Sequence, residues 1–416
     1  MKKKILLMLT DSYPFGLAEN YVKNEIEYLS KYFKEVFIFS RTLNSGESLY
    51  KLPENVRAFS LSGRLLLTDK ILSYRYLISK IFWDEVKYLS HYQLHMRWSI
   101  LKIMLAELKK AHKCMSVLKQ FLTDHNLKEE DIVAYSYWTD SRALASAWLR
   151  NKKITAISRA HGWDVYFERH PILYQPFRKY LHDHLNAIYF VSKDGRDYSL
   201  KRIPGTNTTK FRVSNLGTPF IGRNPDTLSN EFIVVSCARL VSLKRVHLIA
   251  EIISRIKLFP VRWIHFGDGP LQDELLKKTF TLFSGHANIH FDFRGDTSID
   301  EINNYYLQNH VDLFLLTSAY EGKPVVIMEA LSFGIPVMAT NAGGIKEMVN
   351  ESNGFLLNLD FRPEEAAKKI ECFYNMTDKE KENFRSNAFL TWKQSFNADV
   401  NYPLFVEEIL SLGKKD

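Results

Sequence analysis

The chain has 416 residues, enough for two or three domains of ordinary size. Its apolar content of 46% and charged content of 25% are typical of a globular protein, which excludes a disordered chain, a collagen and a coiled-coil rod. The formal net charge of +9 favours an anionic partner: nucleic acid, a membrane surface or a phosphorylated ligand.

Cysteine usage and hydropathy point to a cytoplasmic protein. Cys114, Cys237 and Cys372 are far apart and odd in number, so neither a disulfide framework nor a metal-binding spacing is expected. The apolar run Ile5–Leu9 is too short for an export signal and predicts a buried strand instead. No window holds 18 uninterrupted apolar residues, so we expect no membrane-spanning helix.

The first 40 residues follow a strand-loop-helix-strand pattern. We expect a strand at Lys4–Thr10, a loop at Asp11–Gly16, a helix at Ala18–Tyr32 and a second strand at Val36–Ser40. This is one βαβ unit, and it predicts a parallel sheet.

Residues 60–123 have a helical pattern and differ from their surroundings. Between Arg64 and Lys119 there are 11 basic and 4 acidic residues, interleaved with aromatic residues that include Trp83 and Trp98. One interpretation is a membrane-surface patch that binds anionic lipid while a lipid-linked acceptor enters the site. The other is ordinary amphipathic helices whose aromatic residues form the core and whose lysines face solvent. Strands are expected again at Ile132–Tyr137, Ile154–Ser158 and Ala187–Ser192.

The segment Leu216–Asn230 is the best linker candidate, because it contains two glycines and two prolines. An α/β alternation then restarts. Strands are expected at Phe232–Ser236, Arg262–Phe266, Ile289–Phe293, Leu313–Thr317 and Val337–Thr340, with helices at Val246–Ile256, Leu271–Leu282, Ile299–Gln308, Val325–Phe333 and finally Asn401–Leu412.

This alternation predicts an α/β protein with two Rossmann-like, doubly wound parallel-sheet domains facing a cleft. The predicted N-terminal domain is 1–215, with a basic helical insertion at about 60–123. The predicted C-terminal domain is 216–395, and 396–416 is a helix that packs back on the N-terminal domain. Ligands of open α/β sheets bind at the carboxyl ends of the strands. The polar residues that follow strands are therefore the candidates for the site.

The loop after Leu313–Thr317 is the most informative. Pro324 suits the start of a helix, where its missing N–H costs nothing, and the amides around Lys323–Val326 are free donors for a phosphate or a polar sugar. Glu321 and Glu329 could bind hydroxyl groups at two points of one extended ligand. The alternative is a cap-region carboxylate and a surface helix residue.

Two cations, Arg239 and Lys244, follow the strand Phe232–Ser236 and could neutralise a diphosphate. A solvated basic turn is the alternative. His161 and Asp164 follow the strand Ile154–Ser158, and His161 could bond a sugar or an attacking hydroxyl, although a structural histidine is equally consistent. Gly16 would allow a ligand to approach the backbone closely.

Short patterns in a fixed order extend these observations. They are Ala238-Arg239-Leu-Val-x-x-Lys244, Gly267-Asp-Gly-Pro270, Gly295 before a helix, Glu321-Gly-x-Pro-x-x-x-x-Glu329-Ala, Gly334-x-Pro-Val, Gly343-Gly344 with Glu347, and Asn353-Gly354. As a set they resemble the retaining, nucleotide-sugar-dependent glycosyltransferases of the GT-B fold, glycosyltransferase family 4. The N-terminal half is similar to the members that build bacterial surface and exopolysaccharides, through Pro14-x-Gly16-x-x-Glu19-x-x-Val-x-x-Glu25-Ile and His161-Gly-x-Asp164.

The resemblance implies a role for each candidate. Arg239 and Lys244 would hold the diphosphate, Glu329 the ribose hydroxyls, and His161 the transferred sugar near its reacting carbon. Glu321 would hold the donor sugar together with the segment after it, Gly322, Lys323, Pro324, Val325 and Val326. The loop at Arg294 and Gly295 would lie by the base, and Gly16, Asp164 and Gly267 are further donor-binding candidates. Many members carry a Gly-Gly pair in the first loop, whereas this chain has Phe15-Gly16-Leu17, so the donor-phosphate contact from that loop stays open.

The expected function is therefore transfer of a sugar, with retention and without a metal or other cofactor, from a UDP- or GDP-linked donor. The acceptor would be a saccharide or a lipid-linked saccharide, and the protein would be cytoplasmic or peripheral on the inner face of the plasma membrane. A catalytically weak homologue acting as a binding or regulatory subunit, and an epimerase or phosphorylase on the same fold, stay open as alternatives. Nucleic-acid binding is not expected, because no recognisable binding module is present.

Overall fold

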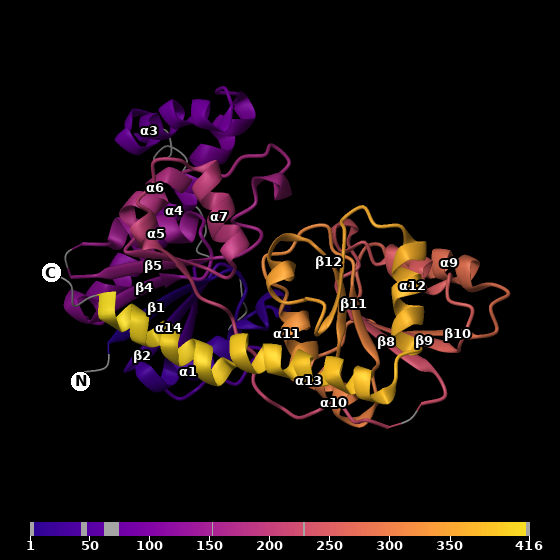
Figure 1. Cartoon of the computed structure of the whole chain (residues 1–416). Coiled ribbons are helices and arrows are strands. Elements are labelled where there is room, and N and C mark those ends of the chain that lie inside the picture. Colours follow the sequence, from indigo (N-terminus) through magenta and orange to yellow (C-terminus); the bar gives the residue numbers. More distant parts are fainter. Residues whose placement is uncertain (1–3, 43–47, 62–74, 152, 228, 413–416) are drawn as a thin grey trace. The chain divides into compact units, whose positions relative to one another are not determined.

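The computed structural model describes residues 4–42, 48–61, 75–151, 153–227 and 229–412. The chain forms two compact units (Figure 1): unit 1 is Met1–Asn215 with Val400–Asp416, and unit 2 is Leu216–Asp399. The chain therefore returns to unit 1 after completing unit 2.

Unit 1 is built on a parallel sheet. In its described residues, seven strands lie in the order β3-β2-β1-β4-β5-β6-β7. They are β1 (Ile5–Thr10), β2 (Glu35–Ser40), β3 (Val56–Ser60), β4 (Ile132–Ser136), β5 (Thr155–Ala160), β6 (Ala187–Phe190) and β7 (Phe211–Val213). The order reverses between β1 and β4. The loops after these two strands therefore lie at a switch point, where ligands of open α/β sheets bind.

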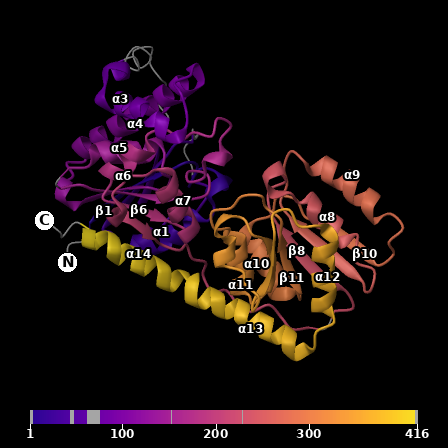
Figure 2. The same ribbon diagram turned by 45° about the horizontal axis from the view of Figure 1, so that its top comes forward.

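Helices cover both faces of this sheet, as Figure 2 shows. Leu7 and Leu9 of β1 join the core beneath α4, whereas Leu6 and Met8 join the core beneath α1 and α14. A strand covered on both faces reads as an uninterrupted apolar run, as β1 does. The helices of unit 1 are α1 (Val22–Tyr32), α3 (Lys80–Tyr88), α4 (Trp98–Asp124), α5 (Ser141–Leu149), α6 (Arg178–His184), α7 (Lys193–Arg202) and α14 (Ala398–Leu412).

The basic segment is helical over most of its described residues, and its aromatic side chains divide between the core and the surface. Helix α4 buries one face through apolar residues three to four positions apart, among them Met104, Leu108 and Leu118. Phe82 and Tyr92 are also buried, but Trp83 is 53% exposed and Trp98 is 69% exposed. Part of the expected segment, residues 62–74, lies outside the described residues.

Unit 2 is a second parallel sheet, with six strands in its described residues in the order β10-β9-β8-β11-β12-β13. Its switch point lies between β8 and β11. The strands are β8 (Phe232–Cys237), β9 (Val261–Phe266), β10 (Ile289–Phe293), β11 (Leu313–Leu316), β12 (Val337–Thr340) and β13 (Gly354–Leu357). The helices are α8 (His247–Ile253), α9 (Gln272–Phe283), α10 (Ile299–Gln308), α11 (Val325–Ser332), α12 (Pro363–Tyr374) and α13 (Asp378–Ser395).

Two expectations for unit 1 need correction. The helix expected from Ala18 begins at Val22, because Leu17–Glu19 forms a separate 3-10 turn, η1. The strands β3 and β7 were not expected. Both lie at an edge of the sheet, and β3 exposes Arg57, so neither carries a continuous apolar run. In the described part of the chain, no helix is long and apolar enough to cross a membrane.

Candidate functional site

The strongest cluster in unit 2 lies at its switch point. Lys244, in the 3-10 turn η7 (Ser242–Lys244) after β8, forms an ion pair with Glu321, in the loop after β11. The two loops are also joined by backbone: Ala319 N–H donates to the Leu243 carbonyl at 2.8 Å. Strands β8 and β11 are adjacent and parallel, so their carboxyl ends bring together residues 77 positions apart. The structure thus brings together two of the predicted catalytic residues.

Arg239 precedes Lys244 in the same loop after β8. It lies directly after β8, its side chain is exposed, and within the described residues it forms no ion pair. The following loop is fixed, because Leu240 N–H donates to the Asp268 carbonyl at 2.7 Å. An exposed, unpaired guanidinium on a fixed loop is suited to an anionic ligand.

The Gly267-Asp-Gly-Pro turn packs against the Arg239 loop. Gly267 has φ +120°, and a Cβ there would lie 2.3 Å from the Ala238 carbonyl oxygen, so a larger residue would displace the loop. Gly267 N–H also donates to the Gly295 carbonyl at 2.7 Å. The neighbouring Arg294 side chain is engaged with Asp292, with 2.6 Å between Nε and Oδ2. Gly267, Arg294 and Gly295 therefore share one edge, after β9 and β10.

Helix α11 begins as expected, with Pro324 at the N-cap and Val325 as its first residue, and no side-chain cap is present among the described residues. Val325 and Val326 are partly exposed, and their amides stand at the positive end of the helix dipole. Lys323 instead turns into the protein: its ammonium is buried and pairs with Glu347 at 3.0 Å. The Gly322 carbonyl accepts a bond from Gly344 N–H at 3.1 Å, which fixes the loop.

Glu329 lies on the second turn of α11 and is half-buried. Among the described residues its carboxyl group has no hydrogen-bond or ion-pair partner, and burial raises its pKa to about 7. The same apolar surroundings raise the pKa of the neighbouring Cys237 thiol to about 12. Glu329 is therefore a carboxyl group held ready to bond a hydroxyl, rather than a partner in an internal salt bridge.

In unit 1, His161 directly follows β5 and is buried between two aromatic rings. Its ring lies 4.8 Å from that of Tyr137 and 4.7 Å from that of Trp138. Neither ring nitrogen has a hydrogen-bond partner in the described residues. Burial, then the positive charges of Arg159 and Arg142, lower the pKa of His161 well below its ordinary value, so the imidazole is neutral at pH 7. A neutral imidazole with free nitrogens can both donate to and accept from a hydroxyl.

Asp164 holds the loop that carries His161. One carboxylate oxygen accepts the His161 backbone N–H and the other accepts the Thr139 N–H, each at 2.6 Å. Burial raises the pKa of Asp164, while Arg178 and the two amides lower it. The structure therefore brings His161 and Asp164 together and engages both Asp164 oxygens within unit 1.

A second buried carboxylate, Glu19, was quoted in the sequence pattern without a role. It accepts backbone N–H groups from the loop after β1, where Gly16 packs so closely that a Cβ would lie 2.9 Å from the Ser12 Cβ. The sequence could have indicated this role, because an acidic residue shortly after the end of a strand can accept hydrogen bonds from the amides of the loop.

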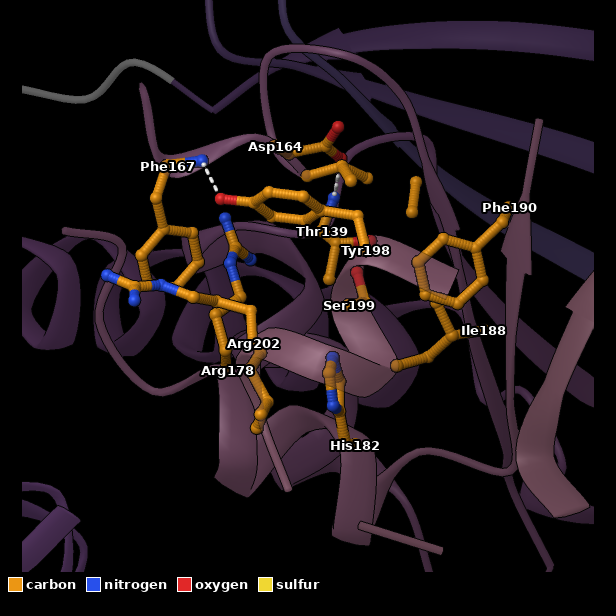
Figure 3. A pocket seen from close by; sticks show the side chains of 13 residues that line it. Thr139, Asp164, Phe167, Arg178, His182, Ile188, Phe190, Tyr198, Ser199 and Arg202 are labelled. Atoms are coloured by element: carbon orange, nitrogen blue, oxygen red, sulfur yellow. Dashed lines mark hydrogen bonds between the residues drawn. The ribbon is translucent and has the colours of Figure 1, made fainter. Parts of the chain in front are cut away.

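A small cavity lies behind Asp164, as Figure 3 shows. Its volume of about 10 Å³ is room for one water, too small for a sugar. Arg178, which lines it, is buried and donates to Gln175 at 2.9 Å, and burial lowers the pKa of its guanidinium. The cavity is a packing feature of unit 1 and touches none of the predicted catalytic residues.

Two parallel-sheet units, each with polar loops at a switch point, define a protein of the GT-B architecture. Solved structures share it. The Anabaena Alr3699/HepE complex with UDP and glucose aligns with a TM-score of 0.66 over 98% of this chain and 100% of that chain, at 17% identity. Sucrose-phosphate synthase (tll1590) from Thermosynechococcus elongatus aligns with a TM-score of 0.73 over 99% of each chain, at 13% identity. The predicted pair of Rossmann-like, parallel-sheet domains is confirmed.

Comparison with known sequences finds a matching family model and several relatives for part of the chain. Residues 221–391, within unit 2, match the family model described as Glycosyl transferases group 1. The O-antigen biosynthesis glycosyltransferase WbnH of Escherichia coli is 31% identical over 200 residues, which are 48% of this chain and 54% of WbnH. The putative teichuronic acid biosynthesis glycosyltransferase TuaC of Bacillus subtilis (strain 168) is 29% identical over 159 residues, 38% of this chain and 35% of TuaC. The chain thus spans about half the length, or less, of these curated relatives.

Proposed function

We propose that this chain is a glycosyltransferase of cell-surface polysaccharide biosynthesis. It transfers a sugar, with retention, from a nucleotide-sugar donor (UDP-linked first, GDP-linked second) to a saccharide or lipid-linked saccharide acceptor. The proposal is supported by the group 1 match over residues 221–391 and by the O-antigen and teichuronic acid relatives. The HepE structures bound to UDP, UDP and glucose, and UDP-glucose support the UDP assignment.

The observation that carries the proposal is the Lys244–Glu321 ion pair, whose lysine lies in the same loop after β8 as the exposed Arg239. Cleavage of a glycosyl–phosphate bond leaves a diphosphate that gains negative charge. On donor binding, the Lys244 ammonium turns to the diphosphate beside Arg239, and Glu321 is released to accept bonds from the sugar hydroxyls. The two cations and the amides of α11 then stabilise the leaving group, which is the task that a metal ion performs in other transferases.

The remaining residues are assigned around this centre. Glu329 accepts the ribose hydroxyls, and the edge formed by Gly267, Arg294 and Gly295 receives the base. His161 bonds the transferred sugar near its reacting carbon. The acceptor hydroxyl attacks on the face that the diphosphate leaves, so the configuration at the anomeric carbon is retained.

The direct test is turnover of UDP-, GDP- and ADP-linked sugars, measured as nucleotide release with and without short saccharide acceptors and in the presence of EDTA. We expect release from one UDP- or GDP-sugar that EDTA does not abolish, and a product whose anomeric configuration by NMR matches the donor. Binding of a donor in calorimetry without any release would instead favour the regulatory-subunit alternative. An inverted product would overturn the retention step.

We also propose that the exposed face of the basic segment binds anionic lipid. Ile78 is 87% exposed, and with Trp83, Trp98 and Met96 it forms an exposed apolar set. Over the described side chains of residues 76–102, the exposed acid is Asp84 and the exposed cations are Lys80, Lys87, Arg97 and Lys102. Tryptophans with interspersed lysines favour the interface of a negatively charged membrane, where a lipid-linked acceptor resides.

Sedimentation with vesicles tests this face. We expect binding to phosphatidylglycerol vesicles that weakens with salt, no binding to phosphatidylcholine vesicles, and loss of binding in the Trp83→Ala, Trp98→Ala double variant. Phe280→Ala, which removes a 63% exposed aromatic residue from unit 2, is the matched control. Equal sedimentation of the wild type and the double variant would overturn the assignment.

A further inference from the structure

The carboxylate of Glu19 is buried under the first loop of unit 1 and gathers its backbone donors. The Glu19 residue is 2% exposed. One oxygen, Oε2, accepts Ser12 N–H at 2.6 Å, Tyr13 N–H at 2.8 Å and Asp11 N–H at 3.0 Å. Three successive amides of the loop after β1 thus point at one carboxylate. Charge-assisted bonds of this kind are about twice as strong as neutral ones, so they set the shape of the loop.

The same carboxylate reaches across the switch point. Its other oxygen, Oε1, accepts the indole N–H of Trp138, which lies in the loop after β4, 119 positions along the chain. Because β1 and β4 are adjacent strands, their loops leave the sheet side by side. Glu19 therefore ties together the two loops that border the ligand-binding edge of unit 1.

Trp138 in turn packs on His161. The two ring centroids are 4.7 Å apart, at an interplanar angle of 43°. Asp164 fixes the backbone of His161, but nothing in the described residues bonds its ring nitrogens. The orientation of the imidazole thus depends on the aromatic rings on either side, and one of these rings is held by Glu19.

From this chain of contacts we infer that Glu19 is a positioning residue, which sets the imidazole of His161 through Trp138. One part of the inference rests on the proposed function: that the imidazole, so positioned, makes productive contact with the sugar. The imidazole is predicted to turn when the Glu19–Trp138 bond is removed, because its own nitrogens offer no competing restraint.

The first experiment reads the geometry without any substrate. The full chain is labelled with ¹⁵N in its tryptophan indoles and histidine rings, and the signals of Trp138 and His161 are assigned with Trp138→Phe and His161→Asn. In Glu19→Gln we expect the Trp138 indole proton to shift upfield and the His161 ring signals to move. The glutamine offers one oxygen in place of two and an NH₂ that repels the amides. Glu27→Gln, an exposed carboxylate on the following helix α1, should leave both signals in place. Unmoved His161 signals in Glu19→Gln would overturn the inference.

The second experiment reads the catalytic consequence. We expect kcat to fall by about 10-fold to 100-fold in Glu19→Gln and in Trp138→Phe, with the KM for the donor nearly unchanged, because small misplacements of a catalytic group act on kcat. In the His161→Asn background, Glu19→Gln should cost nothing further. Trp138→Phe keeps an aromatic ring and serves if Glu19→Gln does not fold. An equal further loss in the His161→Asn background would show that Glu19 acts elsewhere, and would overturn the inference.

The two proposals fail separately. If the His161 signals move in Glu19→Gln but the wild type turns over no nucleotide sugar, the positioning geometry stands and the glycosyltransferase assignment is wrong. If the wild type is active and Glu19→Gln keeps its kcat and its signals, the reverse holds.

Discussion

Both units join the two loops at their switch point with a buried or nearly buried carboxylate, but they choose different partners for it. In unit 1, Glu19 accepts bonds from backbone amides, the Ser12 hydroxyl and an indole, all of them neutral donors. In unit 2, Glu321 pairs with Lys244, whose side chain is 23% exposed. Neutral donors fixed by the backbone cannot be exchanged, whereas a partly exposed lysine can leave its partner for an incoming anion. We therefore expect unit 1 to hold its geometry and unit 2 to change its pairing on ligand binding.

The remaining charges repeat this contrast. Unit 1 uses a buried cation internally: Arg159 is fully buried, contacts Glu25 at 3.3 Å and stacks on Phe405 at 4.1 Å. Unit 2 leaves Arg239 exposed and Glu329 without a partner in the described residues. The following substitutions test the contrast, from the largest expected effect to the smallest.

Breaking the buried pair of unit 1 should have the largest effect, on stability. Arg159→Met should lower the free energy of unfolding of unit 1 by about 3–5 kcal/mol, because Glu25 is left buried without its cation. Burial already raises the pKa of Glu25, and Arg159 opposes that rise, so the variant's Glu25 holds its proton in the folded state more tightly than in the unfolded chain. The loss should therefore grow from pH 5 to pH 8. Urea unfolding at both pH values measures it. A loss that is independent of pH would contradict the pairing.

Removing the exchangeable cation of unit 2 should affect catalysis instead. Lys244→Ala should cost roughly 2–4 kcal/mol of transition-state stabilisation, by analogy with loss of one preorganised donor, while the melting temperature changes little. Steady-state kcat/KM with the active nucleotide sugar measures it. Lys278→Ala, a partly exposed lysine paired with Glu251, is the control and should keep near-wild-type activity. Near-wild-type turnover in Lys244→Ala would show that the cation does not meet the diphosphate.

Glu329→Gln should produce a smaller effect, of opposite sign. The folded pKa of Glu329 is about 7, above its ordinary value, so the wild type loses stability as pH rises from about 4.5 through 7. The neutral glutamine removes that loss, and the variant should be more stable than the wild type by about 1–3 kcal/mol at pH 8 and similar to it at pH 4.5. Thermal unfolding across this range tests it, and calorimetry should show weaker nucleotide binding. A stability difference that does not change with pH would place Glu329 in water.

The smallest effect on stability is expected from an ion pair that is exposed to solvent and is not among the candidate site residues. Arg255 pairs with Glu364 at 2.8 Å, and both side chains are more than 40% exposed. Arg255→Ala should change the free energy of unfolding by about 0–1 kcal/mol, with no change in turnover. A cost as large as that of Arg159→Met would erase the distinction between buried and exposed pairs.

The sequence predicts unit 2 better than unit 1, for physical reasons. Most of its strands are short apolar runs with clear loops between them, so β10, α10 and β12 match their expected bounds, whereas β13, α12 and α13 were not expected. The edge strands β3 and β7 are half-exposed and carry no such run. The sequence pattern after β1 did not predict the η1 turn either. Its position depends on the hydrogen bonds from the loop amides to Glu19, which residue periodicity does not reveal.

The site shows the same limit. The sequence identifies Lys244 and Glu321 as separate candidates, but their ion pair arises from the adjacency of β8 and β11. Backbone amides around Lys323 were expected to be hydrogen-bond donors. The buried ion pair between the Lys323 ammonium and Glu347 was not expected, because the direction of a lysine side chain is set by the residues packed around it. The sequence therefore predicts which polar residues follow strands, but not which of them pair across neighbouring strands.

The return of the chain to unit 1 has a consequence for biosynthesis. Phe405, Val406 and Ile409 of α14 belong to the same core cluster as Leu6 and Met8 of β1. A ribosome makes β1 before unit 2 and these three residues after it. Unit 1 must therefore keep an apolar face uncovered until unit 2 has been translated, and nascent chains paused before residue 405 are the species that chaperones should recognise.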